Sequence, residues 1–252
     1  MMPRALAGTM VAIIVLASAA TVCAAELRLI VASSMAPAIK DLVPRFERAT
    51  GHTAAVTVVP GSAVKRAIDT GGPFDVAIST TAVVDGLIAD GALARDTRVD
   101  VAYAAIGVGI PVGAPKPDIG TVDGFRRALL AAGSVAHSAQ GESGAHFKSV
   151  LERLGIAAAM APKLRPLSSE RLAQAVPSGA ADMVVVTMPV IVAYGTQLVG
   201  PVPAALQFYN RYAAAIGTGA REPVAARGFL DFLTGAAAAK SFEANGMRPG
   251  TP

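Results

Sequence analysis

Short apolar runs alternate with helical patterns from residue 26 onward, and this alternation constrains the fold more than any other feature. Runs rich in apolar and β-branched residues are typical of buried strands, and apolar residues at helical spacing follow each of the first three runs. Strands are expected at 26–32, 53–59 and 74–79, and helices at 36–50, 61–68 and from 80 to about 91. Parallel strands need such crossover helices, so this order predicts an α/β fold with a mainly parallel sheet.

The rest of the chain continues the alternation with less regular spacing. Prolines at positions 111, 115 and 117 mark a loop after one of the strands. We find no repeat of solenoid length, so one or two globular units are expected. Further strands are expected at 103–110, 134–138, 182–187 and 209–216, and further helices at 121–132, 145–154, 168–176, 222–233 and 236–242.

Residues 1–25 have the three parts of a secretory signal peptide. Arg4 gives a positive start, an apolar stretch follows to about Leu16, and small residues lead to a cleavage site after Ala25. An uncleaved membrane anchor and a lipoprotein modified at Cys23 are the alternatives. Cleavage would remove the one cysteine of the chain, so the mature protein is expected to be soluble, periplasmic and free of disulfides.

Composition and charge exclude two classes of protein. Hydrophobic residues make up 53% of the chain and charged residues 16%, which is the reverse of the balance in disordered chains. The formal net charge is +4, but the lysines and arginines are scattered without interleaved aromatic residues, so no nucleic-acid partner is expected. The three histidines, His52, His137 and His146, lack the spacing of metal ligands. We therefore expect neither a metal nor a cofactor.

Serine, threonine or glycine stands at five junctions where a strand or extended run leads into a predicted helix. The first turn of a helix exposes unpaired N–H groups and the positive end of its dipole, and a hydroxyl beside them adds a donor. Several such junctions gathered beyond the carboxyl ends of the strands would hold an anion. Any single serine or threonine here is also an ordinary N-cap. The junctions are Ser33-Ser34, Gly61-Ser62, Thr80-Thr81, Gly141–Gly144 and Ser168-Ser169.

Segments along nearly the whole chain after residue 25 resemble the periplasmic molybdate-binding proteins of ABC importers, which are type II solute-binding proteins. The segments that carry the resemblance are VASSMAPA, GSAVKRAI, GGPFDVAIST, GESGAHFKSVLERLG and the helix-and-glycine ending of residues 229–246.

This resemblance implies a two-lobed fold that closes on a ligand. Lobe 1 would comprise residues 26–104 plus 209–252, and lobe 2 would comprise residues 105–208, with the hinge near Tyr103 and Phe208. The implied partners are a small anion, with a molybdate-like oxyanion as the first expectation, and an ABC permease in the inner membrane. The chain is expected to act as a monomer.

The resemblance also implies a set of ligand-binding residues. Two departures from the family pattern leave room for a larger or differently shaped ligand. Thr187 stands where the molybdate binders have a tyrosine, and Glu142 stands where proline is common. The ligand-binding residues carried over are Ser34, Gly61 with the adjacent Ser62, Ser143, Ser169 and Thr187.

An enzyme on the same scaffold is the alternative function. Proteins that resemble this family include an exported aconitate isomerase, which moves a proton on a tricarboxylate. That reaction needs a general base near the substrate and cations for its carboxylates. The candidates in this sequence are Glu142, His137, His146 and Arg66.

Overall fold

The computed structural model describes residues 24–140, 142–172 and 174–252. The predicted signal peptide, apart from its last two residues, and Gly141 of the fourth junction lie outside the described residues. The strands are β1 Glu26–Ala32, β2 Thr53–Val59, β3 Val76–Thr80, β4 Val99–Ile110, β5 Val135–Ser138, β6 Leu164–Leu167, β7 Met183–Thr187, β8 Gln197–Pro201, β9 Tyr209–Ile216 and β10 Arg248–Pro249. The helices are α1 Ala36–Thr50, α2 Val64–Thr70, α3 Thr81–Ala89, α4 Val122–Ala131, α5 Glu142–Arg153, α6 Ala157–Met160, α7 Ser169–Leu172, α8 Met188–Ala193, α9 Pro223–Thr234 and α10 Ala236–Ala244.

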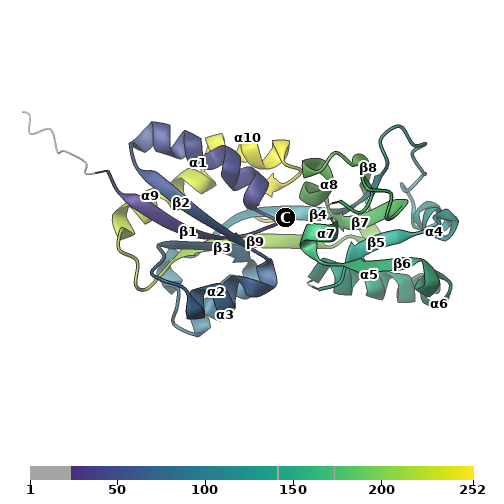
Figure 1. Cartoon of the computed structure of the whole chain (residues 1–252), viewed down its shortest axis with the longest axis horizontal. Coiled ribbons are helices and arrows are strands. Elements are labelled where there is room, and N and C mark those ends of the chain that lie inside the picture. The colour runs from purple at the N-terminus through teal and green to yellow at the C-terminus, as the bar shows by residue number, and fades with distance from the viewer. Residues whose placement is uncertain (1–23, 141, 173) are drawn as a thin grey trace, which may run out of the picture.

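The strands form a curled sheet in the order β2-β1-β3-β9-β4-β7-β5-β6, with helices on both faces (Figure 1). Strands β2, β1 and β3 are parallel to one another, and so are β6, β5 and β7. The strands between these two groups, β9 and β4, pair antiparallel with their neighbours. The predicted α/β class is confirmed, with one parallel group in each half of the molecule.

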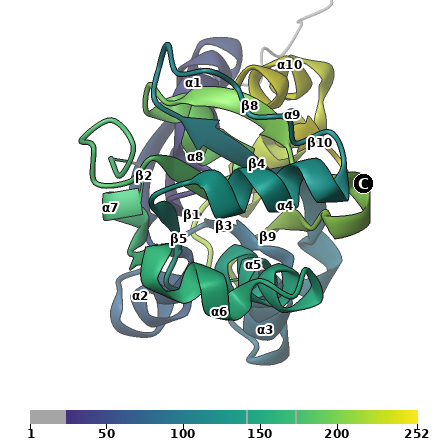
Figure 2. The ribbon, with the colours of Figure 1, turned by 90° about the vertical axis from the view of Figure 1, so that its right-hand side faces the viewer.

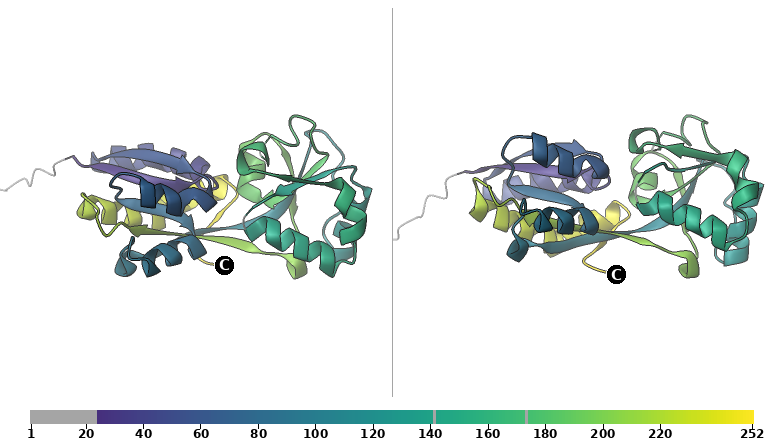
Figure 3. Two further views of the ribbon diagram at one scale, coloured as in Figure 1. Left: turned by 60° about the horizontal axis from the view of Figure 1, so that its bottom comes forward. Right: turned by 90° about the horizontal axis from the view of Figure 1, so that it is seen from below.

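Strand β4 is shared by the two halves. It pairs with β9 from Val99 to Ala105 and then with β7 from Ile106 to Gly109. Figure 3 shows the two halves joined by the strands that run between them. The lobe boundaries predicted above stay a prediction, although the change of partner at Ala105 falls beside the predicted boundary.

Each half buries both faces of its central strands, whereas the edge strand β2 is largely exposed. Along β1, Leu27, Leu29 and Val31 pack with α1, α9 and α10, whereas Ile30 and Ala32 pack with α2 and α3. This follows from the period of two in a strand, which sends successive side chains to opposite faces.

The second half repeats this arrangement with its own helices. Helices α4, α5 and α6 lie over one face of β4, β5 and β7 (Figure 2), where they enclose Val135 and Val185. Helices α7 and α8 pack on the other face against Ala136 and Val184. Four core clusters, two in each half, therefore support the walls that face each other across the molecule.

The structure differs from the predicted elements mainly between residues 156 and 201. Strands β6 and β8 and helices α6 and α8 were not expected there. The helix predicted at 168–176 ends at Leu172, and turns follow, with Ala175 N donating to the Leu172 carbonyl at 3.2 Å. Strand β4 begins four residues before the predicted start at Tyr103.

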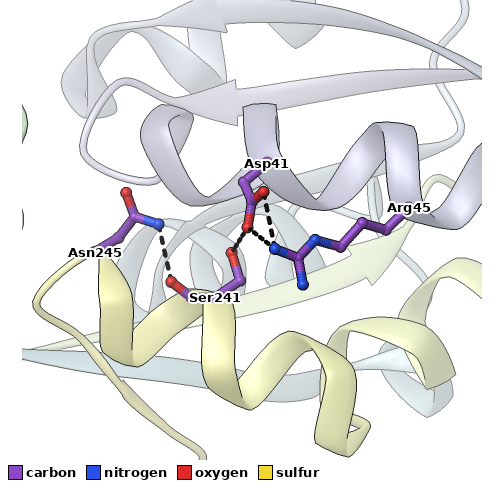
Figure 4. Close-up of polar contacts among 4 residues, drawn as sticks. All are labelled: Asp41, Arg45, Ser241 and Asn245. Atoms are coloured by element: carbon purple, nitrogen blue, oxygen red, sulfur yellow. Dashed lines mark hydrogen bonds and ion pairs between the residues drawn. The ribbon is translucent and has the colours of Figure 1, made fainter.

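Helices α1 and α10 are linked by a polar contact near the C-terminus (Figure 4). The buried Ser241 hydroxyl donates to Asp41 at 2.6 Å, and Arg45 pairs with the same carboxylate at 3.0 Å. The hydrogen bond from Ser241 lowers the pKa of Asp41 more than partial burial raises it, and Arg45 lowers it further. The Asn245 amide donates to the Ser241 carbonyl at 2.8 Å. The contacts between Ser241, Asp41 and Arg45 hold α10 against α1.

A buried carboxylate ties the start of α9 to the parallel strands. Asp75 is 2% exposed and precedes β3. One of its oxygens accepts from the Arg28 N–H at 2.8 Å, and the other accepts from the N–H groups of Arg221 and Glu222 at 2.8 and 3.1 Å. The N–H groups before a helix have no partner within it, so a carboxylate there is stabilising.

We predict that Asp75→Ala lowers the free energy of unfolding by about 3 kcal/mol or more, because three backbone N–H groups lose a charged acceptor. Urea denaturation of the purified variant measures this loss. The matched control is Asp231→Ala at an exposed position of α9, which should stay within about 0.5 kcal/mol of the natural chain. Equal losses in the two variants would contradict the role given to Asp75.

Candidate functional site

A cavity of about 540 Å³ lies between the two halves. Its lining includes residues at or just beyond the carboxyl ends of all six parallel strands, three from each half. Open α/β sheets bind ligands at this edge. The cavity is therefore the candidate functional site.

The first half contributes the turns after β1 and β2 and the end of β3. Ser33 and Ser34 follow β1, Gly61 and Ser62 follow β2, and Thr80 ends β3. Short backbone bonds fix this wall. For example, Ser33 N donates to a carbonyl of β2 at 2.8 Å, so the turn before α1 is held against the neighbouring strand.

The second half contributes the first turn of α5. Ser143, which is buried, lines the cavity, and Gly144 follows it. A Cβ on Gly144 would stand 2.1 Å from the Ser138 carbonyl oxygen at the end of β5. Only glycine allows α5 to start this close to the strand, and this close approach brings Ser143 to the cavity wall.

The helices that begin at the first-half wall are not capped by side chains in the usual way. Helix α4, away from the cavity, has an ordinary cap, since the Thr121 hydroxyl accepts from the Gly124 N–H at 3.0 Å. The residues that precede α1, α2 and α3 make no side-chain cap bond, and the same is true of α9 and α10, which are not at the cavity. Thr80 therefore does not cap α3 through its hydroxyl, whereas Met35 and Ala63, which precede α1 and α2, have no hydroxyl. The first turns of α1, α2 and α3 keep donors that can face a ligand.

The cavity brings together five of the six residues carried over from the family resemblance. The side chain of Ser169 lies outside the part of the chain that the structure describes, and its neighbour Ser168 lines the cavity. The residues that line the cavity are Ser34, Gly61, Ser62, Ser143 and Thr187.

Two of the four residues considered for an enzyme are placed away from the cavity. His137 is buried, its Nδ1 contacts the Ser138 carbonyl at 2.9 Å, and burial lowers its pKa, which favours the neutral ring. The His146 Nε2 contacts the Leu206 carbonyl at 2.8 Å, and its ring stacks on Phe208 at 5.1 Å. Neither histidine lines the cavity. Both have structural partners instead.

The other two, Arg66 and Glu142, line the cavity from opposite halves. Arg66 lies on α2, and Glu142 begins α5. Both side chains are exposed to solvent. The site therefore combines hydroxyls, helix N-termini, one guanidinium and one carboxylate.

Sequence reasoning missed two polar residues of β9 at this site. Asn210 lines the cavity and is 8% exposed. Tyr212 is fully buried, two residues further along the same strand, and therefore on the same face. Burial raises the pKa of Tyr212, and the nearby hydroxyl of Ser34 and amide of Asn210 lower it in part. The sequence signal that could have found Asn210 and Tyr212 is the presence of polar side chains at alternate positions of a predicted strand.

Two other kinds of feature are absent from residues 24–140, 142–172 and 174–252. No cluster of His, Cys, Asp and Glu in these ranges could hold a metal ion. In the same ranges, no helix has both the length and the apolar character needed to span a bilayer.

Comparison with known proteins identifies relatives along most of the chain. A sequence model for bacterial extracellular solute-binding proteins matches residues 27–248. Aconitate isomerase from a Pseudomonas species is 30% identical over 218 residues, which cover 84% of this chain and 83% of the relative.

Solved structures share the fold at lower identity. The periplasmic molybdate-binding protein of Azotobacter vinelandii superposes with a TM-score of 0.74 at 21% identity, over 90% of this chain and 99% of that protein. The sulfate-binding protein SubI of Mycobacterium tuberculosis H37Rv gives a TM-score of 0.71 at 17% identity, over 90% and 88% of the two chains. The predicted type II periplasmic binding protein fold is confirmed.

We predict that replacing Ser34 and Ser62 together by alanine weakens anion binding by at least about tenfold, because two hydroxyl donors to a charged group are lost. Titration calorimetry measures the affinity, and urea denaturation should show little change in stability. Ser149→Ala, at an exposed position of α5, is the control. Unchanged affinity in the double variant would mean that the anion binds elsewhere.

Proposed function

Because the chain belongs to the family of bacterial extracellular solute-binding proteins, we propose that it captures a small anion between its halves and delivers it to an ABC permease in the inner membrane. The observation that carries the proposal is the convergence of strand ends and helix N-termini from both halves on one cavity. Such termini hold an anion without a full positive charge. The protein would work in the periplasm as a monomer after loss of residues 1–25.

The size of the cavity favours an organic anion over a molybdate-like oxyanion. At about 30 Å³ for each oxygen-sized group, the four oxygens of a tetrahedral oxyanion fill roughly 120 Å³. The cavity holds about 540 Å³, within the range of sites for carbon-based ligands. Closure of the halves would reduce this volume, but the lining also offers an apolar wall of Leu167, Leu172, Val186 and Val190. A tetrahedral oxyanion has no carbon skeleton to pack there.

The charges at the site favour a ligand with separated carboxylates. The Arg66 guanidinium can hold one carboxylate through two parallel hydrogen bonds. Glu142 would repel a compact dianion bound at the start of α5. A longer ligand can place its carboxylates at Arg66 and at the serines while an uncharged part faces Glu142. We therefore propose a small polycarboxylate, such as a tricarboxylate, as the ligand.

This proposal predicts the outcome of a thermal-shift screen with citrate, trans-aconitate, molybdate, tungstate and sulfate. A ligand at 100 times its dissociation constant adds about 2.7 kcal/mol, which raises the midpoint of a protein of this size by about 5–10 °C. We expect the largest shift from a tricarboxylate. A larger shift with molybdate or tungstate would contradict the ligand class, and no shift with any anion would contradict the binding function.

An isomerase that acts on a tricarboxylate is the second candidate. The 30% identity to aconitate isomerase favours it, and so does a carboxylate at the cavity. Proton transfer between two carbons of the substrate needs a base within hydrogen-bond reach. Neither His137 nor His146 lines the cavity, so Glu142 would take this role.

The second candidate predicts that the natural chain interconverts cis- and trans-aconitate and that Glu142→Gln loses activity by about 100-fold or more. Binding of trans-aconitate should be retained, because glutamine keeps the size of the side chain. Ultraviolet absorbance of aconitate measures the turnover. The control variant is Glu152→Gln, at an exposed position of α5. Absence of turnover in the natural chain would exclude the isomerase and leave the binding function.

A further inference from the structure

Buried side-chain oxygens without a hydrogen-bond partner gather at one place in the described part of the chain. Four are found among the described residues, on Ser79, Thr81, Asn210 and Tyr212. All four lie where the end of β3 and the start of α3 meet the start of β9, and Thr80 is the direct partner of Tyr212 across the two strands. Natural structures seldom leave buried polar atoms unpaired, so such a cluster needs an explanation.

Two of the four face the α1 side of the sheet, next to the cavity. Tyr212 belongs to the core that packs with α1, whereas its neighbour Ala213 belongs to the core that packs with α2 and α3. Asn210 lies two residues before Tyr212 and so points to the same face, where it lines the cavity.

The Tyr212 hydroxyl lies next to residues that line the cavity. Its near neighbours are Ser34 from the first half, Thr187 from the second half, and Asn210. All three line the cavity. All three are close enough to lower the pKa of the Tyr212 hydroxyl. None of them meets the geometry of a hydrogen bond with it. The hydroxyl is therefore close to lining residues of both halves.

This hydroxyl is suited to donate to an anion. Burial raises the pKa of Tyr212, and the charge of Glu142 raises it further, so the phenol keeps its proton near neutral pH. A neutral phenol offers one O–H donor and does not repel a carboxylate. An anion oxygen that enters between Ser34 and Thr187 would give this donor the partner that it lacks.

We propose that the Tyr212 hydroxyl donates a hydrogen bond to the anion bound in the cavity, an inference that rests on the binding function proposed above. Tyr212 thereby adds a ligand contact from β9, the strand that lies between the parallel group of the first half and β4. The contact would also set how deeply the ligand enters, because the ring is fixed within the core of α1, α9 and α10.

The test is Tyr212→Phe, which removes one oxygen and keeps the ring that packs in the core. Titration calorimetry with citrate and trans-aconitate is carried out on the natural chain and on the variant. We expect the dissociation constant to rise about 10- to 100-fold, as for a lost hydrogen bond to a charged group. The midpoint of thermal unfolding without ligand should stay the same or rise, because the oxygen has no partner in the folded protein.

Tyr209→Phe is the matched control, since Tyr209 is 41% exposed, lies on the same strand and is not part of the cavity lining. An increase of about fivefold or more for Tyr212→Phe relative to Tyr209→Phe supports the proposal, and a smaller increase overturns it. A drop in the unliganded midpoint with unchanged affinity would show a purely structural role and would also overturn it. The natural chain is also titrated with molybdate and with sulfate. If it binds none of the four anions, the proposed binding function is wrong, and this inference is wrong with it.

Discussion

Two groups of parallel strands end on opposite sides of one cavity, and the chemistry available to the site depends on that arrangement of strand ends. Backbone N–H groups in the first turn of a helix have no partner within the helix. Where α1, α2 and α3 begin, the preceding residue supplies no side-chain cap, and the cavity lies next to these starts. In the second half, the close approach of Gly144 to β5 brings the start of α5 to the same space. Under the proposed function, an anion in the cavity would accept hydrogen bonds from donors of both halves at once.

Strands β4 and β9 connect this site to the rest of the molecule. Strand β4 exchanges β9 for β7 as its partner at Ala105, so it belongs to both halves. Strand β9 brings Asn210 to the cavity and Tyr212 next to residues that line it. Movement of one half relative to the other would therefore change the positions of residues at the cavity. This is the geometry that a protein needs if it is to close on a solute.

The local parts of the fold could be predicted from the sequence, and the long-range parts could not. The segment from β1 to β2 has the predicted bounds, because its apolar residues repeat with clear periods of two and of 3.6. Strand β6 was missed because it has four residues and contains Pro166. Ser34 and Ser143 could be selected because each lies at a junction between a predicted strand and the next helix, and because the family resemblance implies both. The polar alternation along β9 marks Tyr212 as unusual, but its place beside the first half's wall could not be predicted, since it results from the pairing of β3 with β9 across more than a hundred residues.

The crystal structure of the protein grown with trans-aconitate or citrate tests the central claim most directly. The account predicts a single ligand between the halves, with carboxylate oxygens within hydrogen-bond distance of Ser34, Ser143 and the Tyr212 hydroxyl, and with Arg66 on another carboxylate. Ligand bound outside the cavity would contradict the account. So would ligand within the cavity whose carboxylates avoid the starts of α1 and α5.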